Sequence, residues 1–266
     1  RLFRRLFRPA EPKKLLISIG AGINQIPLIR CAKNAGYSVI SVDMNSSAPG
    51  LLYSDLKIQE SILSREEIYN KIQELLVDGT IVGALTRSYG EAVQTAAFLN
   101  EKLGIPYIPQ TRVDDLIDKK KMKSVFHKAG IPSPSYRIFD QTRDAKDYPF
   151  VLKPAKGHAK QGVRLIRGSA DLEEYLSEFP PDAAHHLIKE AFIGGDEVIA
   201  AGIAADGIFH LAEITDKVTT NHPFFVDIRH QAPSKHFGRW EEIERIGQQV
   251  GDSFNITTSP LFLEIR

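Results

Sequence analysis

Two lysines in separate stretches of the chain are placed where they could bind a phosphate group. Lys119 belongs to a basic run, residues 118–123, on a predicted helix. Lys153 ends an apolar strand-like stretch directly before Pro154, and a lysine there is costly unless it meets an anion or faces water. A charge run is more often a solvated helix face, so the basic run alone does not establish a site.

The loop that follows Lys153 is also positively charged. Between residues 156 and 162 it carries two lysines together with Gly157 and Gly162. A loop of this kind can fold over phosphates, using its backbone N–H groups and ammonium groups. It is not a Walker A loop, because the Gly-Lys-Ser/Thr ending is absent.

Residues 187–197 combine a strand, a short hinge, a Gly-Gly pair and an acid that opens the next strand. Extended backbone around Ala191 and Ile193 can pair with the edge of an adenine. The carboxylate of Glu197 can accept hydrogen bonds from both hydroxyls of a ribose. The alternative is a β-hairpin with a Gly-Gly turn and exposed acids, and this segment taken alone favours the hairpin.

The segment from Gly20 to Gln25 (GAGINQ) resembles a dinucleotide-binding fingerprint, but Gln25 stands where the third glycine is required. Asp43 follows about 20 residues further on, where an acid would bind the ribose. The pattern therefore permits NAD binding. It equally permits a tight strand–helix turn in which the glycines serve only the backbone.

A second loop, residues 86–91 (TRSYGE), follows a predicted strand and opens a helix. Ligands of open α/β sheets bind outside such carboxyl ends of strands. Arg87, Ser88 and the helix amides could hold a carboxylate or a phosphate. A capped helix start with surface charges explains the loop equally well.

The elements that must position these residues change in character along the chain. Strands and helices alternate over about residues 1–110, which predicts a doubly wound parallel sheet. The second half predicts an α+β arrangement with an antiparallel sheet. In chain order, the predicted strands are 13–19, 37–43, 80–85, 149–153, 163–167, 186–190, 196–204, 208–215 and 259–266. The predicted helices are 26–36, 65–77, 90–103, two short helices within 111–130, 170–178 and 239–253.

The composition limits the classes of function. The 266 residues have a formal net charge of +1, so no global field attracts nucleic acid or membrane and any anion site must be local. No apolar run approaches the ~18 residues of a membrane span. The single cysteine, Cys31, excludes an intramolecular disulfide framework, and we expect it to pack within a helix. The chain begins with a basic tail rather than Met and ends inside a strand-like run, so we expect both ends to be cut from a longer protein.

In this order and at these spacings, the segments resemble the ATP-grasp superfamily, whose members include biotin carboxylase, carbamoyl-phosphate synthetase and D-alanine–D-alanine ligase. The stretch 20–45 is similar to the preATP-grasp domain, in which the glycine turn abuts the substrate site and binds no dinucleotide. NAD therefore becomes the less favoured alternative. The resemblance implies a basic tail (1–12), a Rossmann-like preATP-grasp substrate domain (13–110), an ATP-grasp small lobe with a lid (111–183) and an incomplete second lobe with an antiparallel sheet (184–266).

The resemblance also implies roles for individual residues. Lys119, 11 residues before Gly130, and Lys153 would contact the ATP phosphates, and Lys217 and Arg229 would contact phosphate or an acyl phosphate. The remaining implied site residues are Gly157 and Gly162 in the lid, Glu190, Ala191, Phe192 and Ile193 at the adenine, Glu197 at the ribose, Gly22, Arg87 and Ser88 at the substrate, and Glu264 at a magnesium ion.

The implied activity is an ATP- and Mg²⁺-dependent ligase, with Mn²⁺ as a substitute ion, that activates a carboxylate as an acyl phosphate and couples it to an amine. The implied partners are small-molecule carboxylates and amines and a second copy of the chain, with no nucleic acid or membrane, in the cytoplasm. Two departures favour a nucleotide-binding module without turnover. The lid has few glycines, and the strand that normally carries a second metal-binding acid is not among the 266 residues, so we expect this chain alone to be inactive.

Overall fold

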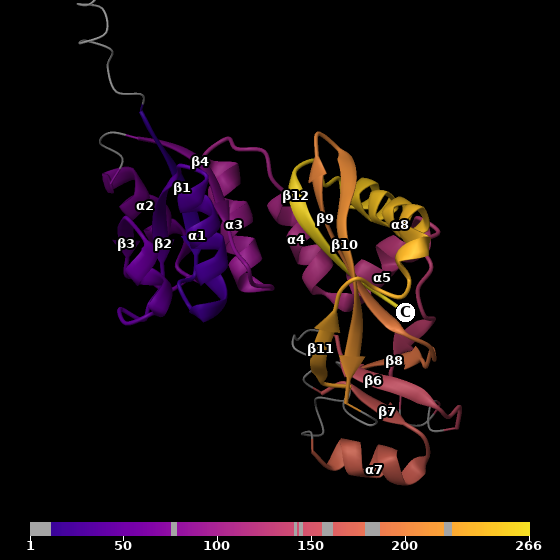
Figure 1. The fold of residues 1–266 in the computed structure, drawn as a ribbon. Coiled ribbons are helices and arrows are strands. Elements are labelled where there is room, and N and C mark those ends of the chain that lie inside the picture. Colours follow the sequence, from indigo (N-terminus) through magenta and orange to yellow (C-terminus); the bar gives the residue numbers. More distant parts are fainter. Residues whose placement is uncertain are drawn as a thin grey trace, which may run out of the picture. The chain divides into compact units, whose positions relative to one another are not determined.

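The computed structural model describes residues 12–75, 79–140, 143, 146–155, 162–178, 187–220 and 225–266. The chain divides into two compact units, one that ends at Gln110 and one that begins at Thr111. Figure 1 shows the elements of each unit. Among the described helices, none is long and apolar enough to cross a membrane.

The first unit is built on a parallel sheet with the strand order β3-β2-β1-β4. One face is covered by α2 and α3 and the other by α1, as the apolar clusters on the two faces show. The sheet is therefore doubly wound, as predicted. Its elements are β1 (Lys13–Ile19), η1 (Ile23–Gln25), α1 (Ile26–Asn34), β2 (Ser38–Val42), η2 (Pro49–Tyr53), β3 (Leu56–Ile58), α2 (Arg65–Leu75), β4 (Gly79–Leu85) and α3 (Glu91–Lys102).

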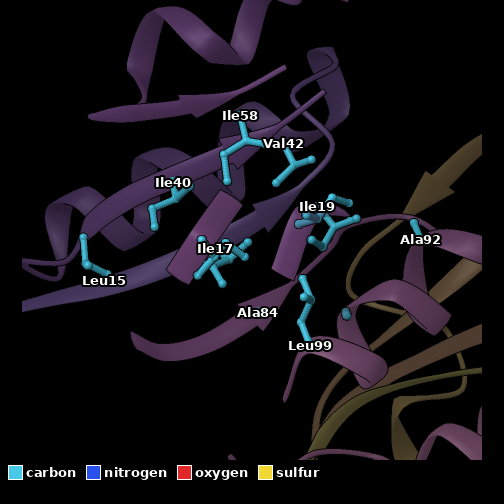
Figure 2. Packing of buried hydrophobic residues seen from close by; sticks show 12 residues of the cluster. Leu15, Ile17, Ile19, Ile40, Val42, Ile58, Ala84, Ala92 and Leu99 are labelled. Carbon is cyan, nitrogen blue, oxygen red and sulfur yellow. The ribbon is translucent and has the colours of Figure 1, made fainter. Parts of the chain in front are cut away.

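The larger apolar cluster of this unit buries one face of the parallel sheet, and the smaller cluster buries the other. Ile17 and Ile19 of β1 are fully buried, and Ile40 of β2 lies beside them. Figure 2 shows these side chains packed with Ala92 and Leu99 of α3. Strands covered on both faces need apolar residues at successive positions, which is why residues 15–19 form a continuous apolar run interrupted only by a serine. The prediction that Cys31 packs in the helix is wrong, because the side chain is exposed.

The second unit contains two four-stranded sheets, with the orders β5-β8-β6-β7 and β11-β10-β9-β12, and every pairing in both is antiparallel. This agrees with the predicted α+β architecture. The elements are α4 (Gln110–Ile117), α5 (Lys119–Lys128), β5 (Tyr136–Ile138), β6 (Phe150–Pro154), β7 (Arg164–Ile166), α7 (Ser169–Ser177), β8 (Leu187–Ala191), β9 (Glu197–Ala205), β10 (Ile208–Thr219), β11 (Asp227–Gln231), η4 (Phe237–Arg239), α8 (Trp240–Ser253) and β12 (Ser259–Ile265).

Each sheet of the second unit packs one face against a helix, and the other face carries the charged side chains of the candidate site. The first packs Phe150 and Leu152 against α7. The second packs against α8 (Figure 1) around Phe209. Gly202 and Gly247 leave room for that ring, because a Cβ on either would lie 2.5 Å or 2.1 Å from it.

The helix α5 connects with both halves of this unit. Its residue Phe126 contacts Phe254, which follows α8, edge to face with ring centroids 6.0 Å apart. The short strands β3, β5 and β11 were not predicted. Each has only three to five residues, and a strand that short carries too little alternation to be recognised.

Candidate functional site

A cluster of lysines forms where α5 faces the sheet β5-β8-β6-β7. The helix begins after Asp118, whose side chain accepts a hydrogen bond from the backbone N–H of Lys120 at 2.9 Å. Lys119 and Lys123 are four residues apart and so lie on one side of this helix. The two lysines therefore occupy successive turns of the same helix face.

Glu190 joins the helix to the sheet. Its carboxylate forms an ion pair with Lys123 of α5 and accepts a hydrogen bond at 2.5 Å from Nζ of Lys153 in β6. In the register of β6 and β8, Lys153 lies opposite Ile188 and Glu190 lies opposite Val151. Lys153 and Glu190 are thus diagonal neighbours on one face of the sheet.

Burial distinguishes the lysines. The side chain of Lys123 is 4% exposed and that of Lys153 is 16% exposed. Burial lowers the pKa of Lys123, although the hydrogen bond to Glu190 opposes it. Burial also lowers the pKa of Lys119, and the nearby charge of Lys153 adds to the effect. Three ammonium groups here face two carboxylates, Glu190 and Asp118, so the cluster has excess positive charge suited to an anion.

Lys123 was not predicted as a site residue. The basic run around it allowed a solvated helix face as one interpretation, yet Lys123 is buried, donates to the carbonyl of Pro134 at 3.2 Å and lies 5.5 Å from the ring centroid of Tyr136. The available signal was its spacing of four residues from Lys119, which places both on one helix face.

The hinge after β8 is held by an arginine from the end of β12. Arg266 donates through Nη1 to the carbonyl of Ile193 at 3.0 Å and through Nη2 to Glu197 at 2.8 Å. Upstream, the N–H of Ala191 donates to the carbonyl of Ser135 at 2.9 Å. Phe192 lies between the two anchored positions. The predicted adenine and ribose residues therefore form one continuous segment that joins the two sheets of this unit.

Lys217 lies on the open face of the second sheet among three carboxylates. Its side chain is 0% exposed, and Nζ is 2.8 Å from Glu197, 2.9 Å from Glu264 and 3.3 Å from Asp227. Burial acts to lower the pKa of Lys217, but the hydrogen bonds to Glu197 and Glu264 outweigh it and raise the pKa above its usual value. An ammonium group has three donors, so these contacts match its capacity.

Arg229 is not brought together with Lys217. In the antiparallel pairing of β10 and β11, Arg229 lies opposite Val218 and His230 lies opposite Lys217. Residues directly opposite share a face and neighbours in sequence alternate. Arg229 therefore lies on the face opposite Lys217.

A cleft of about 730 Å³ opens where β9 begins. Its lining includes Glu197, Lys217 and Arg266, together with the connection after β11. On that connection, Lys235 forms an ion pair at 2.9 Å with Asp196, next to the hinge. Charged side chains therefore line the cleft beside the hinge, whose residues 193–196 are themselves exposed.

Glu264 is the described residue that was predicted to bind a metal ion. Carboxylate oxygens suit Mg²⁺, but Glu264 contacts Lys217, and the described part of the chain holds no group of three His, Cys, Asp or Glu residues that could coordinate an ion. These residues do not form a complete cation site. In the predicted lid, Gly157 lies outside the described residues, and Gly162 accepts a hydrogen bond at 2.7 Å from the hydroxyl of Tyr175.

The predicted substrate residues of the first unit lie at the carboxyl ends of β1 and β4. Gly22 precedes η1, and the exposed Arg87 and Ser88 follow β4. The backbone N–H of Arg87 donates to Oε1 of Gln25 at 2.8 Å, and Nη1 of Arg87 donates to the carbonyl of Asn24 at 3.1 Å. The two loops are therefore joined into one polar surface.

This surface is unlike a dinucleotide site. Asp43, the candidate ribose acid, accepts the N–H groups of Ala21 at 2.8 Å and Asn45 at 2.9 Å. The first turn of α1 contains Pro27, which has no N–H to offer a pyrophosphate. Asp43 therefore braces the glycine turn, a role that was not predicted, and the contacts agree with the interpretation in which the glycines serve only the turn.

No protein-family model matches the chain. It is 23% identical over 226 residues to the large chain of carbamoyl phosphate synthase from Corynebacterium glutamicum, which covers 73% of this chain and 20% of that protein. Its structure is similar to that of an L-amino acid ligase from Bacillus licheniformis, with a TM-score of 0.77 and 22% identity, over 97% of this chain and 64% of the ligase. The chain has the ATP-grasp fold.

An ADP complex of N5-carboxyaminoimidazole ribonucleotide synthetase also has this fold, with a TM-score of 0.76 and 19% identity over 95% of this chain and 66% of that one. The chain spans about a fifth of the length of the synthase relative and about two thirds of the length of these two structures. The predicted ATP-grasp resemblance and fold class are confirmed. The lysine cluster, the hinge and Lys217 all lie in the second unit of this chain.

Proposed function

We propose that this protein binds ATP in its second unit and belongs to a ligase that activates a carboxylate as an acyl phosphate and couples it to an amine. The observation that carries the proposal is the convergence of Lys119, Lys123 and Lys153 around Glu190, beside the hinge. An excess of ammonium groups in a partly desolvated site is what a polyphosphate requires. The ligase and synthetase names of the similar proteins support the same activity.

Each part of the nucleotide has a proposed partner. Lys119 and Lys153, the more exposed lysines of the cluster, would neutralise the phosphates, and Gly157 and Gly162 would belong to the lid. The adenine would lie against the hinge at Ala191, Phe192 and Ile193, with Glu190 at its edge. The ribose would be held by Glu197, whose carboxylate is already oriented by Lys217 and Arg266.

The first unit would bind the carboxylate substrate through Gly22, Arg87 and Ser88. Arg87 is the cation of this surface, and its guanidinium can bind a carboxylate with two parallel hydrogen bonds. Lys217 and Arg229 were predicted to contact the phosphate or the acyl phosphate. The contacts of Lys217 with three carboxylates favour a different role, in which it orients Glu197 and Glu264. Arg229 stays a candidate on the opposite face.

The negative charges of the two reactants determine what the lysines of the cluster must do. A carboxylate oxygen of the substrate attacks the γ-phosphorus of ATP, the bond to the β-phosphate oxygen breaks, and ADP leaves. Both reactants are anionic, so the lysines must offset their repulsion and hold them in line. The amine then attacks the acyl carbon and releases phosphate. A lid that excludes water protects the acyl phosphate from hydrolysis.

Magnesium would enter with the triphosphate as its counter-ion, with Glu264 as a protein ligand and Mn²⁺ as a substitute. The described residues lack a complete site for the ion. We also propose a cytoplasmic location, small-molecule substrates and a homodimer, which the fold permits and does not require.

ATP titration by calorimetry tests nucleotide binding, with Lys153→Ala as the test variant and Lys121→Ala as its control. Lys121 lies on α5 with Lys119 and Lys123, but its side chain is 57% exposed and pairs with Asp115 at 3.8 Å. We expect Lys153→Ala to weaken ATP binding at least tenfold and Lys121→Ala to change it little. Equal effects of the two variants would remove the support for a phosphate site at Lys153.

Phosphate release from the full-length protein, with candidate carboxylates and amines, separates a ligase from a nucleotide-binding module. ATP binding without turnover on any acceptor pair would favour the module, which the few glycines of residues 156–162 also favour. In the ligase, Lys153→Ala abolishes phosphate release. An NAD-dependent oxidoreductase is disfavoured by the contacts of Asp43, and nicotinamide fluorescence that is unchanged on titration would exclude it.

A further inference from the structure

Gln25 is a buried amide at the carboxyl edge of the parallel sheet in the first unit. It is 5% exposed and stands where a dinucleotide fingerprint has its third glycine. Its Oε1 accepts the backbone N–H of Arg87 at 2.8 Å. Because a backbone N–H can only donate, this bond determines which end of the amide is oxygen. The two N–H donors of Nε2 must therefore point away from Arg87.

No described residue accepts a hydrogen bond from Nε2 of Gln25. In the described part of the chain, Oη of Tyr148 is the one fully buried side-chain polar atom without a partner, so Nε2 of Gln25 reaches the surface of the site and is accessible to a ligand. The amide lies over Gly20, where an added Cβ would be 3.4 Å from Cγ and 3.9 Å from Nε2. Beside it, a Cβ on Gly22 would meet no atom within 4 Å. The donor thus adjoins open space above the glycine turn.

The charged groups around this space favour an anion. The guanidinium of Arg87 lies over the carbonyl of Asn24, to which it donates through one of its five N–H groups. Asp43 is the nearby acid, and each of its two oxygens already accepts a backbone N–H, from Ala21 and from Asn45. A hydrogen-bond donor and an arginine on two loops joined by these contacts suit the oxygens of an oxyanion.

We infer that Gln25 is a specificity-determining residue that donates a hydrogen bond through Nε2 to an oxyanion, a carboxylate or a phosphate, whose charge Arg87 neutralises. This rests on the proposed function, because it deepens the substrate site assigned to Gly22, Arg87 and Ser88. Its consequence is selectivity. A ligand without an acceptor oxygen at this point leaves the amide unpaired and is rejected, as sites built for polar groups reject analogues that lack them.

Titration of the wild-type chain tests the inference without any substitution. Acetate and inorganic phosphate are the two probes, sodium chloride at equal ionic strength is the control, and the Nε2–H₂ resonances of ¹⁵N-labelled protein are the readout. We expect saturable shifts of the Gln25 side-chain amide together with the Arg87 backbone amide, and the probe that causes them identifies the oxyanion. Shifts at Arg87 without shifts at Gln25, or no saturable shift with either probe, would overturn the inference.

The substitution Gln25→Glu separates recognition of the ligand through Nε2 from support of the Arg87 backbone through Oε1. It keeps an oxygen for the N–H of Arg87 but replaces the Nε2 donor with a second oxygen. We expect at least tenfold weaker binding of the active probe, whereas Gln249→Glu adds the same charge at an exposed position of α8 and leaves binding unchanged. Unaltered affinity in folded Gln25→Glu would refute the assignment, and the wild-type titration decides if that variant does not fold.

The same samples keep this inference separate from the nucleotide proposal. ATP binding is followed through the resonances of residues near Lys153, in the other unit of the chain. Loss of ATP binding with an intact Gln25 response would refute the nucleotide site alone, and the reverse result would refute the Gln25 assignment alone.

Discussion

The substitution Glu190→Gln would remove a negative charge from the centre of the lysine cluster while keeping the shape of the side chain. In the folded chain, this carboxylate forms ion pairs with Lys123 and Lys153. The amide cannot balance either ammonium group. Lys123 has almost no route to water, because its side chain is 4% exposed, whereas Lys153 at 16% can turn partly towards solvent.

The magnitude follows from this burial. Removal of one partner from a buried ion pair costs about 3–5 kcal/mol, and a single substitution here deprives two lysines of their carboxylate. We therefore expect the free energy of unfolding to fall by about 3–5 kcal/mol without ligand. The control is Glu178→Gln, because Glu178 is 48% exposed and pairs with Arg164 at 2.9 Å. Arg164 is 11% exposed, but Glu178 itself is solvated and Arg164 has a second carboxylate, Glu174, at 4.0 Å, so we expect a smaller loss in Glu178→Gln.

Urea unfolding with and without inorganic tripolyphosphate provides the assay. A ligand that binds only the folded state stabilises it in proportion to its affinity. The variant has one more unbalanced positive charge than the wild type, so tripolyphosphate should raise its unfolding midpoint further than that of the wild type or of Glu178→Gln. Equal losses in the two variants, or equal stabilisation of all three proteins by tripolyphosphate, would refute a cluster poised for polyphosphate.

Three further predictions concern other parts of the second unit. Lys217→Met should lower the free energy of unfolding by about 3–5 kcal/mol, because three carboxylates lose their cation, whereas Lys235→Met at an exposed pair should change it little; equal urea midpoints would contradict this. Gly247→Ala should cost about 1–3 kcal/mol through overpacking against the neighbouring phenylalanine ring, while a Cβ on Gly238 meets nothing within 4 Å, so similar urea curves for the two alanine variants would be inconsistent with the packing. The pKa of Lys119 is lowered in the folded chain, so between that pKa and 10.5 the unfolded chain binds more protons than the folded chain. The charged Lys119 therefore lowers the free energy of unfolding fully below this pH window, and the loss disappears as the pH rises through it. Lys119→Met should accordingly be more stable than the wild type at pH 7, with a smaller advantage near pH 10, and a difference in urea midpoints that is the same at both pH values would contradict the linkage.

The parallel sheet of the first unit was predictable because its strands are apolar on both faces and alternate with helices. Lys119 and Lys153 were recognisable from their positions at a helix start and at a strand end. Their convergence on Glu190 was not evident from any single segment. It depends on the β6–β8 register and on the packing of α5, which join residues 119, 153 and 190 through tertiary contacts that no local pattern encodes.

The role of Lys217 could not be predicted for the same reason. Its three carboxylates come from β9, β11 and β12, so each contact requires the completed antiparallel sheet. Arg229 was expected to contact the same phosphate or acyl phosphate, but its position depends on the register of the five-residue strand β11. A shift of one residue in that pairing would exchange the two faces, and nothing in the residues around Arg229 specifies the register.

The helix α5 connects the lysine cluster with the aromatic contact between Phe126 and Phe254. Lys119, Lys123 and Phe126 follow one another along one stripe at spacings of four and three residues, and the last of them rests on Phe254 after α8. A helix is stiff over so short a length. The ammonium groups at one end of this stripe are therefore rigidly connected to the contact between Phe126 and Phe254 at the other end. A change that loosens the contact between Phe126 and Phe254 should shift the ammonium groups of Lys119 and Lys123. The affinity for an anion should therefore depend on packing two helical turns away.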